Sequence, residues 1–195
     1  MGSYSTRLSA NLSVDHMKKI NFTPKTILNI GVGSCPELAV WRNRLPDVAL
    51  LGVDVRGQRR WNAPFINALV GGQENEEVVF CVSCKSIKCN DLSHRRGGKT
   101  KTRTIDGIVS QNNSIPPYFL WMDIEGGELD ALKGATKTLL NTPLINLEMR
   151  EFAWTNNYCK DLNEFLISTG YILIGSENKQ GITLEDKLYQ RMDWK

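Results

Sequence analysis

Three carboxylates follow one another closely where an apolar run gives way to a helical pattern. Asp123, Glu125 and Glu128 come directly after the apolar residues 119–122. Ligands bind at the carboxyl ends of strands in an open α/β sheet, so a strand ending at Asp123 would present this side chain to a ligand. Alternation places Asp123 and Glu125 on one side of the chain, where they repel each other unless a cation such as a sulfonium or ammonium lies nearby. Glu128 is also explained as a first-turn acid favoured by the helix dipole.

A glycine turn forms the second candidate site. Gly31 and Gly33 follow the apolar residues 26–30. Two glycines allow a tight turn and let a ligand lie against bare peptide groups. A dinucleotide site would have a third glycine where Pro36 stands, which argues against NAD or FAD. A ligand with a carboxylate and a ribose remains compatible.

Asp54 strengthens this interpretation. It ends the apolar residues 49–53 and follows Gly31 by 23 residues, close to the ~20 at which an acidic residue after the second strand binds ribose hydroxyls. A carboxylate accepts two charge-assisted hydrogen bonds from such a diol. The alternative is a surface Asp that begins a turn at a strand end.

Glu148 is the first candidate for a general base. It ends the apolar residues 144–147, which we expect to form the strand beside that of Asp123. A hydroxyl acceptor benefits from a base that takes its proton, and Asp123 is the second candidate for this role. The alternative is that Glu148 pairs with Arg150 at the rim of the sheet.

Four residues are of the types that bind metals, but the sequence around them does not favour a metal site. Cys81, Cys84, Cys89 and His94 are spaced C-x2-C-x4-C-x4-H, and four such ligands can hold tetrahedral zinc. However, Cys81 falls inside the strand-like residues 78–83, and no glycine between these ligands lets the backbone fold round a metal. We therefore predict no metal. With five cysteines and no export signal in the sequence, we expect reduced thiols.

A basic run lies next to these cysteines. Five cations crowd into nine residues around Gly97 and Gly98: Arg95, Arg96, Lys99, Lys101 and Arg103. We interpret residues 84–103 as a solvated basic loop insertion, with a phosphate-binding patch as the alternative. The net charge of +3 does not by itself indicate nucleic acid.

The elements that must position these residues alternate between strand-like and helix-like stretches, as in a mostly parallel sheet covered by helices. Strand-like stretches are residues 26–30, 49–53, 65–70, 78–83, 119–122, 144–147, 171–174 and an antiparallel last strand at 188–192. Helix-like stretches are a helix opened by Pro36 and capped by Ser34 or Cys35, residues 128–140, and a helix capped by Asp161. Residues 104–109 fit a strand or a short helix.

Size and hydropathy predict one domain in a cytoplasmic protein. The 195 residues fit a single domain, with residues 1–22 as an N-terminal helical extension. There is no run of 18 apolar residues, as a membrane span would need, and residues 1–22 do not have the pattern of a secretory signal.

The sequence resembles the FkbM family of methyltransferases. The family signature, a strand reading roughly K-I-D-V-E-G-x-E followed by L-x-G-A, matches Trp121–Glu128 and Leu132–Ala135. Thr104-Ile105-Asp106 matches the family's T-L-D, and Ile145–Glu148 matches its next strand. The resemblance implies a Rossmann-like class I methyltransferase fold, a mostly parallel seven-stranded sheet with helices on both faces. It also implies S-adenosyl-L-methionine as cofactor and O-methylation of sugars, glycolipids or other small molecules.

The resemblance also implies roles for individual residues. Gly31 and Gly33 would lie against the methionine part of the cofactor and Asp54 would hold its ribose. Asn67 and Ala68 would flank the adenine, whereas Asp123 and Glu125 would face the sulfonium and the acceptor. The chain departs from the family in having Gly33-Ser34 in place of G-A-N and in the cationic residues 84–103.

Two rival functions stay open. The basic loop would suit an RNA-directed methyltransferase, but the Lys-Asp-Lys-Glu set of cap 2′-O enzymes has a Lys on the strand where this chain has Glu148. A binding protein that kept the fold and lost the chemistry would not need Gly31, Gly33, Asp54 and Asp123 together. We expect a small-molecule or glycan acceptor, with nucleic acid less favoured and no membrane partner. The oligomeric state is left open.

Overall fold

The computed structural model describes residues 2–56, 63–79, 99–150, 157–178 and 184–194. The helices in chain order are α1 (Gly2–Lys19), α2 (Leu38–Arg44), α3 (Ile105–Gln111), α4 (Glu128–Lys133), α5 (Thr136–Leu139) and α6 (Tyr158–Ser168). The strands are β1 (Thr26–Ile30), β2 (Ala49–Asp54), β3 (Phe65–Asn67), β4 (Leu69–Val70), β5 (Glu77–Val79), β6 (Lys99–Arg103), β7 (Tyr118–Met122), β8 (Leu144–Arg150), β9 (Tyr171–Asn178) and β10 (Leu184–Arg191).

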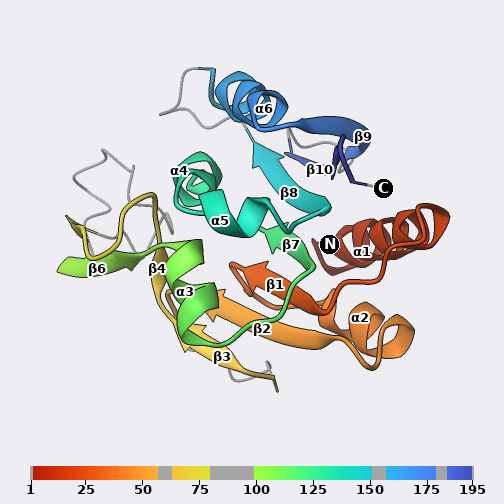
Figure 1. The fold of residues 1–195 in the computed structure, drawn as a ribbon, viewed down its shortest axis with the longest axis horizontal. Helices are drawn as coiled ribbons and strands as arrows, with labels where there is room; N and C mark the ends of the chain where they lie inside the picture. The colour runs from red at the N-terminus through yellow and green to blue at the C-terminus, as the bar shows by residue number, and fades with distance from the viewer. Residues whose placement is uncertain (1, 57–62, 80–98, 151–156, 179–183, 195) are drawn as a thin grey trace.

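A seven-stranded sheet forms the centre of the molecule, in the order β3-β2-β1-β7-β8-β10-β9 (Figure 1). Strands β3, β2, β1, β7 and β8 are parallel to their neighbours, whereas β10 is antiparallel to both β8 and β9. The predicted mostly parallel sheet and its antiparallel last strand are therefore confirmed. A smaller sheet, in the order β4-β6-β5, lies beside it.

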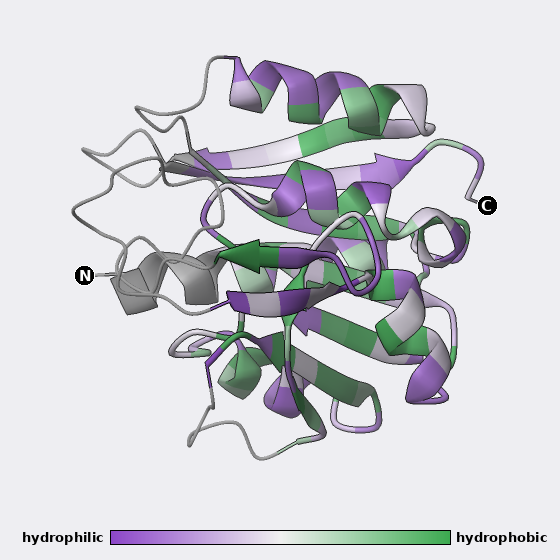
Figure 2. Ribbon diagram, turned by 90° about the vertical axis from the view of Figure 1, so that its left-hand side faces the viewer, coloured by the Kyte–Doolittle hydropathy of each residue, from purple (hydrophilic) through white to green (hydrophobic). Residues whose placement is uncertain are grey.

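Both faces of the central sheet are covered by helices. Every residue of β1 and of β7 is buried, and most of them are apolar, as expected of parallel strands covered on both sides. Figure 2 shows hydrophobic stretches, in green, along several strands of the molecule. Helices α1 and α2 pack on one face around Trp41, Phe119 and Trp121. Helices α3, α4, α5 and α6 pack on the other face around Leu120, Leu132 and Leu162. No described helix has the length and apolarity to cross a membrane.

Two predicted elements are each divided in the structure. The predicted strand 65–70 forms two strands, β3 and β4, which belong to different sheets. Between them, the Ala68 amide donates to the Asp54 carbonyl (3.0 Å), and β4 then pairs with β6. The predicted helix 128–140 is broken at Gly134. A Cβ on Gly134 would lie only 2.6 Å from the Gly71 carbonyl oxygen, so this close approach of two backbones requires glycine.

The predicted helix caps at Ser34, Cys35 and Asp161 are wrong. Helix α2 begins only at Leu38, after a turn, and its N-cap is Glu37 with no side-chain capping bond. Helix α6 begins at Tyr158, so Asp161 lies inside its first turn. The position of a cap depends on the residue at which tertiary packing lets the helix begin. Short sequence patterns do not determine that residue.

Residues 104–109, which fitted either a strand or a helix, and the described part of the basic loop both form regular elements. Residues 104–109 belong to helix α3, whose N-cap is Thr104. The last five residues of the predicted basic loop form strand β6, which pairs with β4 and β5. Residues 84–98 of that loop lie outside the described residues.

Candidate active site

A pocket opens at the carboxyl ends of β1, β2 and β7. Its volume is about 590 Å³, which includes space at the solvent-exposed mouth. Its lining comes from the segments after these strands and from β4: Ile30, Gly31, Val53, Asp54, Val55, Arg56, Ala68, Leu69, Val70, Asp123, Ile124, Glu125 and Gly127. The sheet therefore brings Gly31, Asp54, Ala68, Asp123 and Glu125 to one pocket, whereas Gly33, Asn67 and Glu148 are not among the described residues that line it.

The glycine turn fits tightly against the strand that carries Asp123. Gly31 has φ +85°, and an added Cβ would overlap the Asp123 carbonyl group. Its amide donates to the Val53 carbonyl at 2.7 Å. Gly33 also has a positive φ, +51°, and its amide donates to Asp54 Oδ2 at 3.0 Å. Gly33 thus shapes the pocket through Asp54 and is not among the described residues that line it.

Asp54 is held in place by backbone groups on both sides. Its Oδ1 accepts the Arg56 amide at 2.8 Å and lies 3.6 Å from Arg56 Nε. Only 6% of Asp54 is exposed, at the pocket. A carboxylate at this position can accept hydrogen bonds from ligand groups such as ribose hydroxyls.

Asn67 and Ala68 lie in different environments. Ala68 lines the pocket, whereas Asn67 is not among the described lining residues. The Asn67 side chain donates to the carbonyls of Asp54 (3.3 Å) and Val55 (3.0 Å). It therefore fixes the chain that follows β2, and a direct contact with an adenine stays a prediction.

Asp123 and Glu148 form a coupled carboxyl pair. Met122 pairs with Leu147, so Asp123, directly after β7, and Glu148 lie next to each other on neighbouring parallel strands. The prediction that Glu148 ends its strand is wrong, because β8 pairs with β10 as far as Arg150. A hydrogen bond joins their side chains. Burial, followed by the nearby charge of Glu148, raises the pKa of Asp123 well above its usual value. The Asp123 carboxyl thus holds its proton more strongly than an isolated aspartate does. The Arg150 side chain, the predicted alternative partner of Glu148, lies outside the described residues.

Glu128 shapes the loop that carries Glu125. Glu125 has φ +55° and lines the pocket. The buried Glu128 carboxylate accepts the amides of Ile124 and Gly126, each at 3.0 Å, and a hydrogen bond from the Tyr158 hydroxyl. The first-turn explanation of Glu128 is therefore incomplete, because this side chain holds the whole loop. Its partner Tyr158 is distant in sequence and could not have been found from the motif.

A buried acid on the α2 side of the sheet was missed by the sequence analysis. Glu37 is 3% exposed and accepts a hydrogen bond from Asn29 Nδ2 at 2.7 Å. Burial raises the pKa of Glu37 to about 7, and the charges of Asp186 and Glu148 add to this. Glu37 and Asp186 stand in no recognisable motif, so only the tertiary structure connects them with Glu148.

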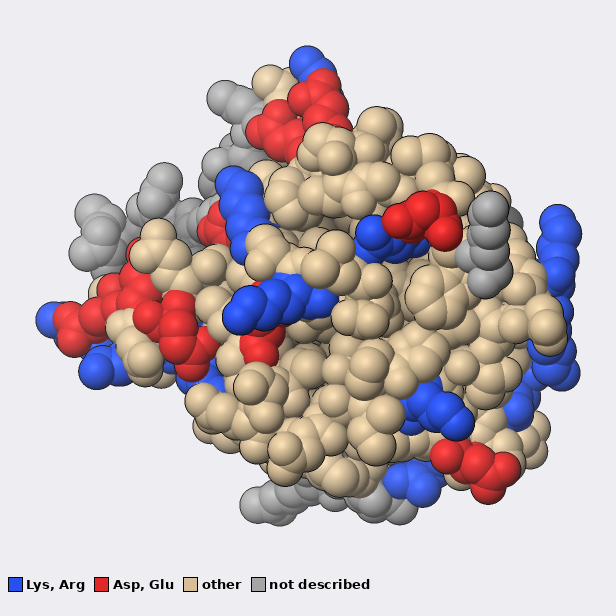
Figure 3. Space-filling model, in the orientation of Figure 1, with Lys and Arg blue, Asp and Glu red and all other residues tan. Residues whose placement is uncertain are grey.

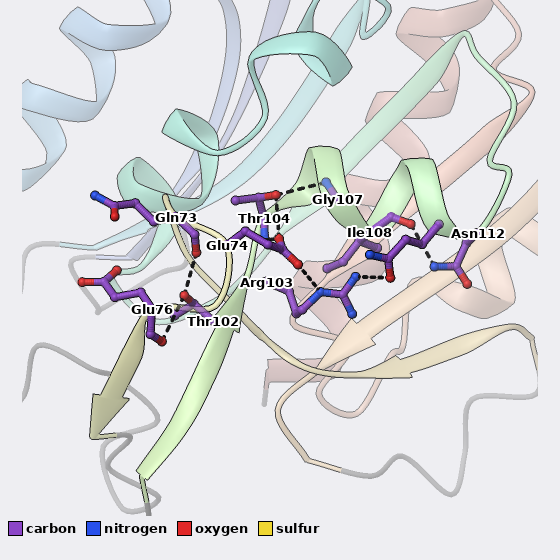
Figure 4. Close-up of polar contacts among 10 residues, drawn as sticks. Gln73, Glu74, Glu76, Thr102, Arg103, Thr104, Gly107, Ile108 and Asn112 are labelled. Atoms are coloured by element: carbon purple, nitrogen blue, oxygen red, sulfur yellow. Dashed lines mark hydrogen bonds and ion pairs between the residues drawn. The ribbon is translucent and has the colours of Figure 1, made fainter.

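The Thr104-Ile105-Asp106 motif is structural. Thr104 Oγ1 accepts the Gly107 amide at 3.0 Å, and Glu74 accepts the Thr104 amide and Arg103 Nε, each at 2.6 Å (Figure 4). The Asp106 carboxylate accepts the amides of Thr138 (2.8 Å) and Lys137 (2.9 Å) at the start of α5. The motif therefore joins α3, the turn before β5 and α5.

The described cations of the basic run are partly neutralised. Lys99 pairs with Glu77 (2.8 Å) and Arg103 with Glu74 (2.6 Å). On the face shown in Figure 3, several Lys and Arg side chains lie beside acidic ones, and others gather along the right-hand edge. The candidate zinc ligands Cys81, Cys84, Cys89 and His94 lie outside the described residues, so the prediction of no metal stays a prediction.

The sequence model of the methyltransferase FkbM domain matches residues 61–173, more than half of the chain. The chain belongs to the FkbM methyltransferase family. The matched region of this FkbM domain contains Asp123, Glu125 and Glu148, whereas Gly31, Gly33 and Asp54 precede it. No protein of curated function matches the sequence.

Several solved methyltransferase structures are similar to this FkbM domain. The plantazolicin methyltransferase BpumL, in complex with a monoazolic desmethylPZN analog and SAH, has a TM-score of 0.50 and 13% identity, over 95% of this chain and 84% of that chain. Magnesium protoporphyrin IX methyltransferase (ChlM) from Synechocystis PCC 6803 has a TM-score of 0.49 and 10% identity, over 95% and 79%. Precorrin-6y C5,15-methyltransferase from Geobacter metallireducens GS-15 has a TM-score of 0.48 and 11% identity, over 93% and 87%. At these identities the shared feature is the fold, that of class I methyltransferases.

Proposed function

We propose that the protein is an S-adenosyl-L-methionine-dependent methyltransferase that methylates a hydroxyl of a sugar, glycolipid or other small molecule. The observation that carries the proposal is the pocket itself, with Asp54 on β2 and the Asp123–Glu148 pair on β7 and β8, in a chain of the FkbM family. The BpumL structure, which shares the fold, contains SAH, and this supports the choice of cofactor.

The described residues fit this cofactor. Gly31, with φ +85°, lines the pocket beside the apolar residues Ile30 and Val53, a mixed lining of the kind that small-molecule sites have. Asp54 lines the pocket, and a carboxylate is suited to accept hydrogen bonds from two ribose hydroxyls. The Glu125 carboxylate lines the same pocket and makes it favourable for a positively charged sulfur.

The chain's own contribution to catalysis is positioning and proton transfer. S-adenosyl-L-methionine, when bound, supplies a methyl group on a positively charged sulfur and leaves as a neutral thioether. The acceptor oxygen gains the methyl group and loses its proton, and we assign Glu148 as the group that takes this proton. The raised pKa of Asp123 favours its protonated form, which would donate to Glu148 and orient it. Fixed groups of this kind accelerate the reaction by holding the acceptor in line with the methyl group.

Calorimetry with S-adenosyl-L-methionine and S-adenosylhomocysteine tests the cofactor assignment. We expect Asp54→Asn to lower the affinity by roughly 1.5–3 kcal/mol, the usual loss for hydrogen bonds to a charged group. Asp47→Asn is the matched control, because exposed Asp47 precedes β2 at the opposite end of the strand. Equal affinities of the two variants would remove Asp54 from the cofactor site.

Transfer of a radiolabelled methyl group tests the acceptor class. We expect label in hydroxylated small molecules and glycans and none in RNA. Label in RNA alone would replace the proposed acceptor class. Cofactor binding with no transfer to any acceptor class would favour a binding protein that has lost the chemistry.

A further inference from the structure

A second cavity lies between α1 and the antiparallel end of the central sheet. It encloses about 550 Å³ of space that is open to solvent. Its polar lining includes Ser9, Ser13, His16, Asn146, Glu177 and Asp186, from α1, β8, β9 and β10. None of these side chains belongs to the pocket at β1, β2 and β7, and the proposed function does not use them.

A row of carboxylates connects the two sites. Glu148 pairs with Asp186 across β8 and β10, and Asp186 pairs with Glu177 across β10 and β9. Residues directly opposite each other in a sheet present their side chains to the same face. Asp123, Glu148, Asp186 and Glu177, which we call the acidic row, therefore cross four neighbouring strands on the face that α1 covers. At about 4.8 Å between strands, Asp186 lies roughly 10 Å from the strand of Asp123.

The lining of this second cavity is rich in acceptors. Ser9 Oγ lies 2.5 Å from Asp186 Oδ2 and 2.6 Å from Glu177 Oε2, and its single proton can serve only one of them. His16 Nε2 faces Gln190 Oε1 at 2.9 Å. Among the described lining residues none is Lys or Arg. Two carboxylates of the acidic row therefore converge on one Ser9 hydroxyl in this cavity.

Asn146 gives an independent indication of a ligand. The side chain is 3% exposed, and its Oδ1 has no hydrogen-bond partner among the described residues. Its orientation is set by Ser13, because Ser13 Oγ donates to the Ser9 carbonyl (2.9 Å) and so accepts from Asn146 Nδ2 (3.4 Å). A buried acceptor without a donor is unfavourable, and a donor that enters the cavity would relieve this.

We propose that the second cavity binds a protonated amine of the methyl acceptor. An ammonium group has three donors and a positive charge, which match Asn146 Oδ1 and the carboxylates of Asp186 and Glu177. Within the described parts of the chain, no three carboxylate, imidazole or thiol groups converge as metal ligands, so an organic cation fits better than a metal ion. The inference rests on the proposed function, since it places the amine beside the acceptor hydroxyl at Glu148.

Glucosamine, glucose and N-acetylglucosamine are suitable probes, because they differ at one position in carrying an ammonium, a hydroxyl or a neutral amide. Their binding to the full chain is measured by ligand-observed NMR with and without S-adenosylhomocysteine. We expect glucosamine to bind about 10-fold or more tightly than the two neutral sugars, from its charge-assisted hydrogen bonds. Asp186→Asn should abolish this preference and leave S-adenosylhomocysteine affinity unchanged. Glu185→Gln is the matched control, because this neighbouring residue pairs with Lys187 (3.2 Å) and points to the opposite face.

The outcomes separate this inference from the proposed function. Equal binding of the three sugars to a protein that binds S-adenosylhomocysteine would overturn the inference and leave the proposed function standing. A preference for glucosamine without any cofactor binding would support an amine site and contradict the methyltransferase proposal. If circular dichroism shows that Asp186→Asn does not fold, Glu177→Gln takes its place, and an unchanged glucosamine preference in that variant would overturn the inference.

Discussion

At the scale of single residues, the proposed chemistry depends on carboxyl groups whose pKa values are raised above those of isolated side chains. Burial and the neighbouring Glu148 raise the pKa of Asp123, and burial raises that of Glu37 to about 7. Both acids lie on the same face of the sheet as Glu148. A proton shared within this group lets several carboxyls lie together without the full repulsion of their charges.

The two members of the coupled pair should respond differently to amide substitution. Asparagine resembles the protonated aspartic acid in shape and charge, so Asp123→Asn should lower turnover by only about 10-fold, whereas Glu148→Gln removes the proton acceptor and should cost about 100-fold or more. Methyl-transfer rates with a saturating acceptor give both values. A larger loss in Asp123→Asn than in Glu148→Gln would make Asp123 the base.

Glu37 should make stability depend on pH. Its pKa rises from 4.5 to about 7 on folding, so between these values the native state holds a proton that the unfolded state has lost. The contribution is complete below pH 4.5 and is lost as the pH rises through 7, by about 3 kcal/mol at most. Glu37→Gln keeps the acceptor for Asn29 and stays neutral, so it should gain stability relative to the parent as the pH increases.

Denaturant unfolding between pH 4.5 and 8 measures this difference. Exposed Glu164, which lies 3.8 Å from Lys160 on the surface of α6, provides the control variant Glu164→Gln. Its curve should run parallel to that of the parent protein. Parallel curves for Glu37→Gln as well would show that the Glu37 carboxyl is already ionised in the native state.

At the scale of elements, the site is held by side chains that connect the ends of helices and loops. Asp106 receives the first amides of α5, Thr104 caps α3, and Glu128 fixes the loop of Glu125. Gly134 lets α4 and α5 approach Gly71 closely. Much of the family signature is therefore explained by packing and capping around the pocket, and only part of it by contact with ligands.

Removal of the Asp106 carboxylate should destabilise the fold. It accepts hydrogen bonds from the Thr138 amide (2.8 Å), the Thr138 hydroxyl (2.7 Å) and the Lys137 amide (2.9 Å). We expect Asp106→Ala to lower the free energy of unfolding by about 1–2 kcal/mol, as for other lost helix caps. Chemical denaturation measures the change, and Glu164→Ala on the surface of α6 should cost less than about 0.5 kcal/mol. Equal losses in the two variants would contradict the capping role.

At the scale of the whole molecule, the sheet separates two hydrophobic cores and gathers the polar chemistry at one edge. Helices α1 and α2 cover one face and α3, α4, α5 and α6 the other (Figure 1). The pocket at β1, β2 and β7 and the second cavity both involve this edge, joined by the acidic row. A ligand in the pocket contacts segments that follow three different strands, so its binding should stabilise the fold as a unit.

Thermal unfolding with S-adenosylhomocysteine tests this coupling. At a ligand concentration of 100 times Kd, binding to the native state adds about 2.7 kcal/mol, which corresponds to roughly 5–10 °C in Tm for a chain of this length. NAD at the same concentration should give no shift, because Pro36 stands where a dinucleotide site has its third glycine. A larger shift with NAD would overturn the cofactor assignment.

The sequence by itself determined the features that depend on neighbours along the chain. The apolar runs of β1, β2, β7 and β8, the turn at Gly31 and the acids that follow these runs are all local, because a buried parallel strand and the residue after it leave a short, continuous pattern. Parallel pairing then brings strand ends to one edge whatever the details of packing, so the meeting of Gly31, Asp54 and Asp123 was predictable.

Only the tertiary structure decided which distant groups meet. Glu37, Asp186 and Tyr158 carry no local signal, and each acquires its role from a strand register or a helix packed across the sheet. The caps of α2 and α6, the break at Gly134 and the division of residues 65–70 were likewise set by close backbone approaches between segments far apart in the chain. Register and packing depend on the summed burial of many side chains, and no short sequence pattern contains this information. They determine how deeply the acids of the site are buried and which charges lie beside them, and therefore in which direction their pKa values shift.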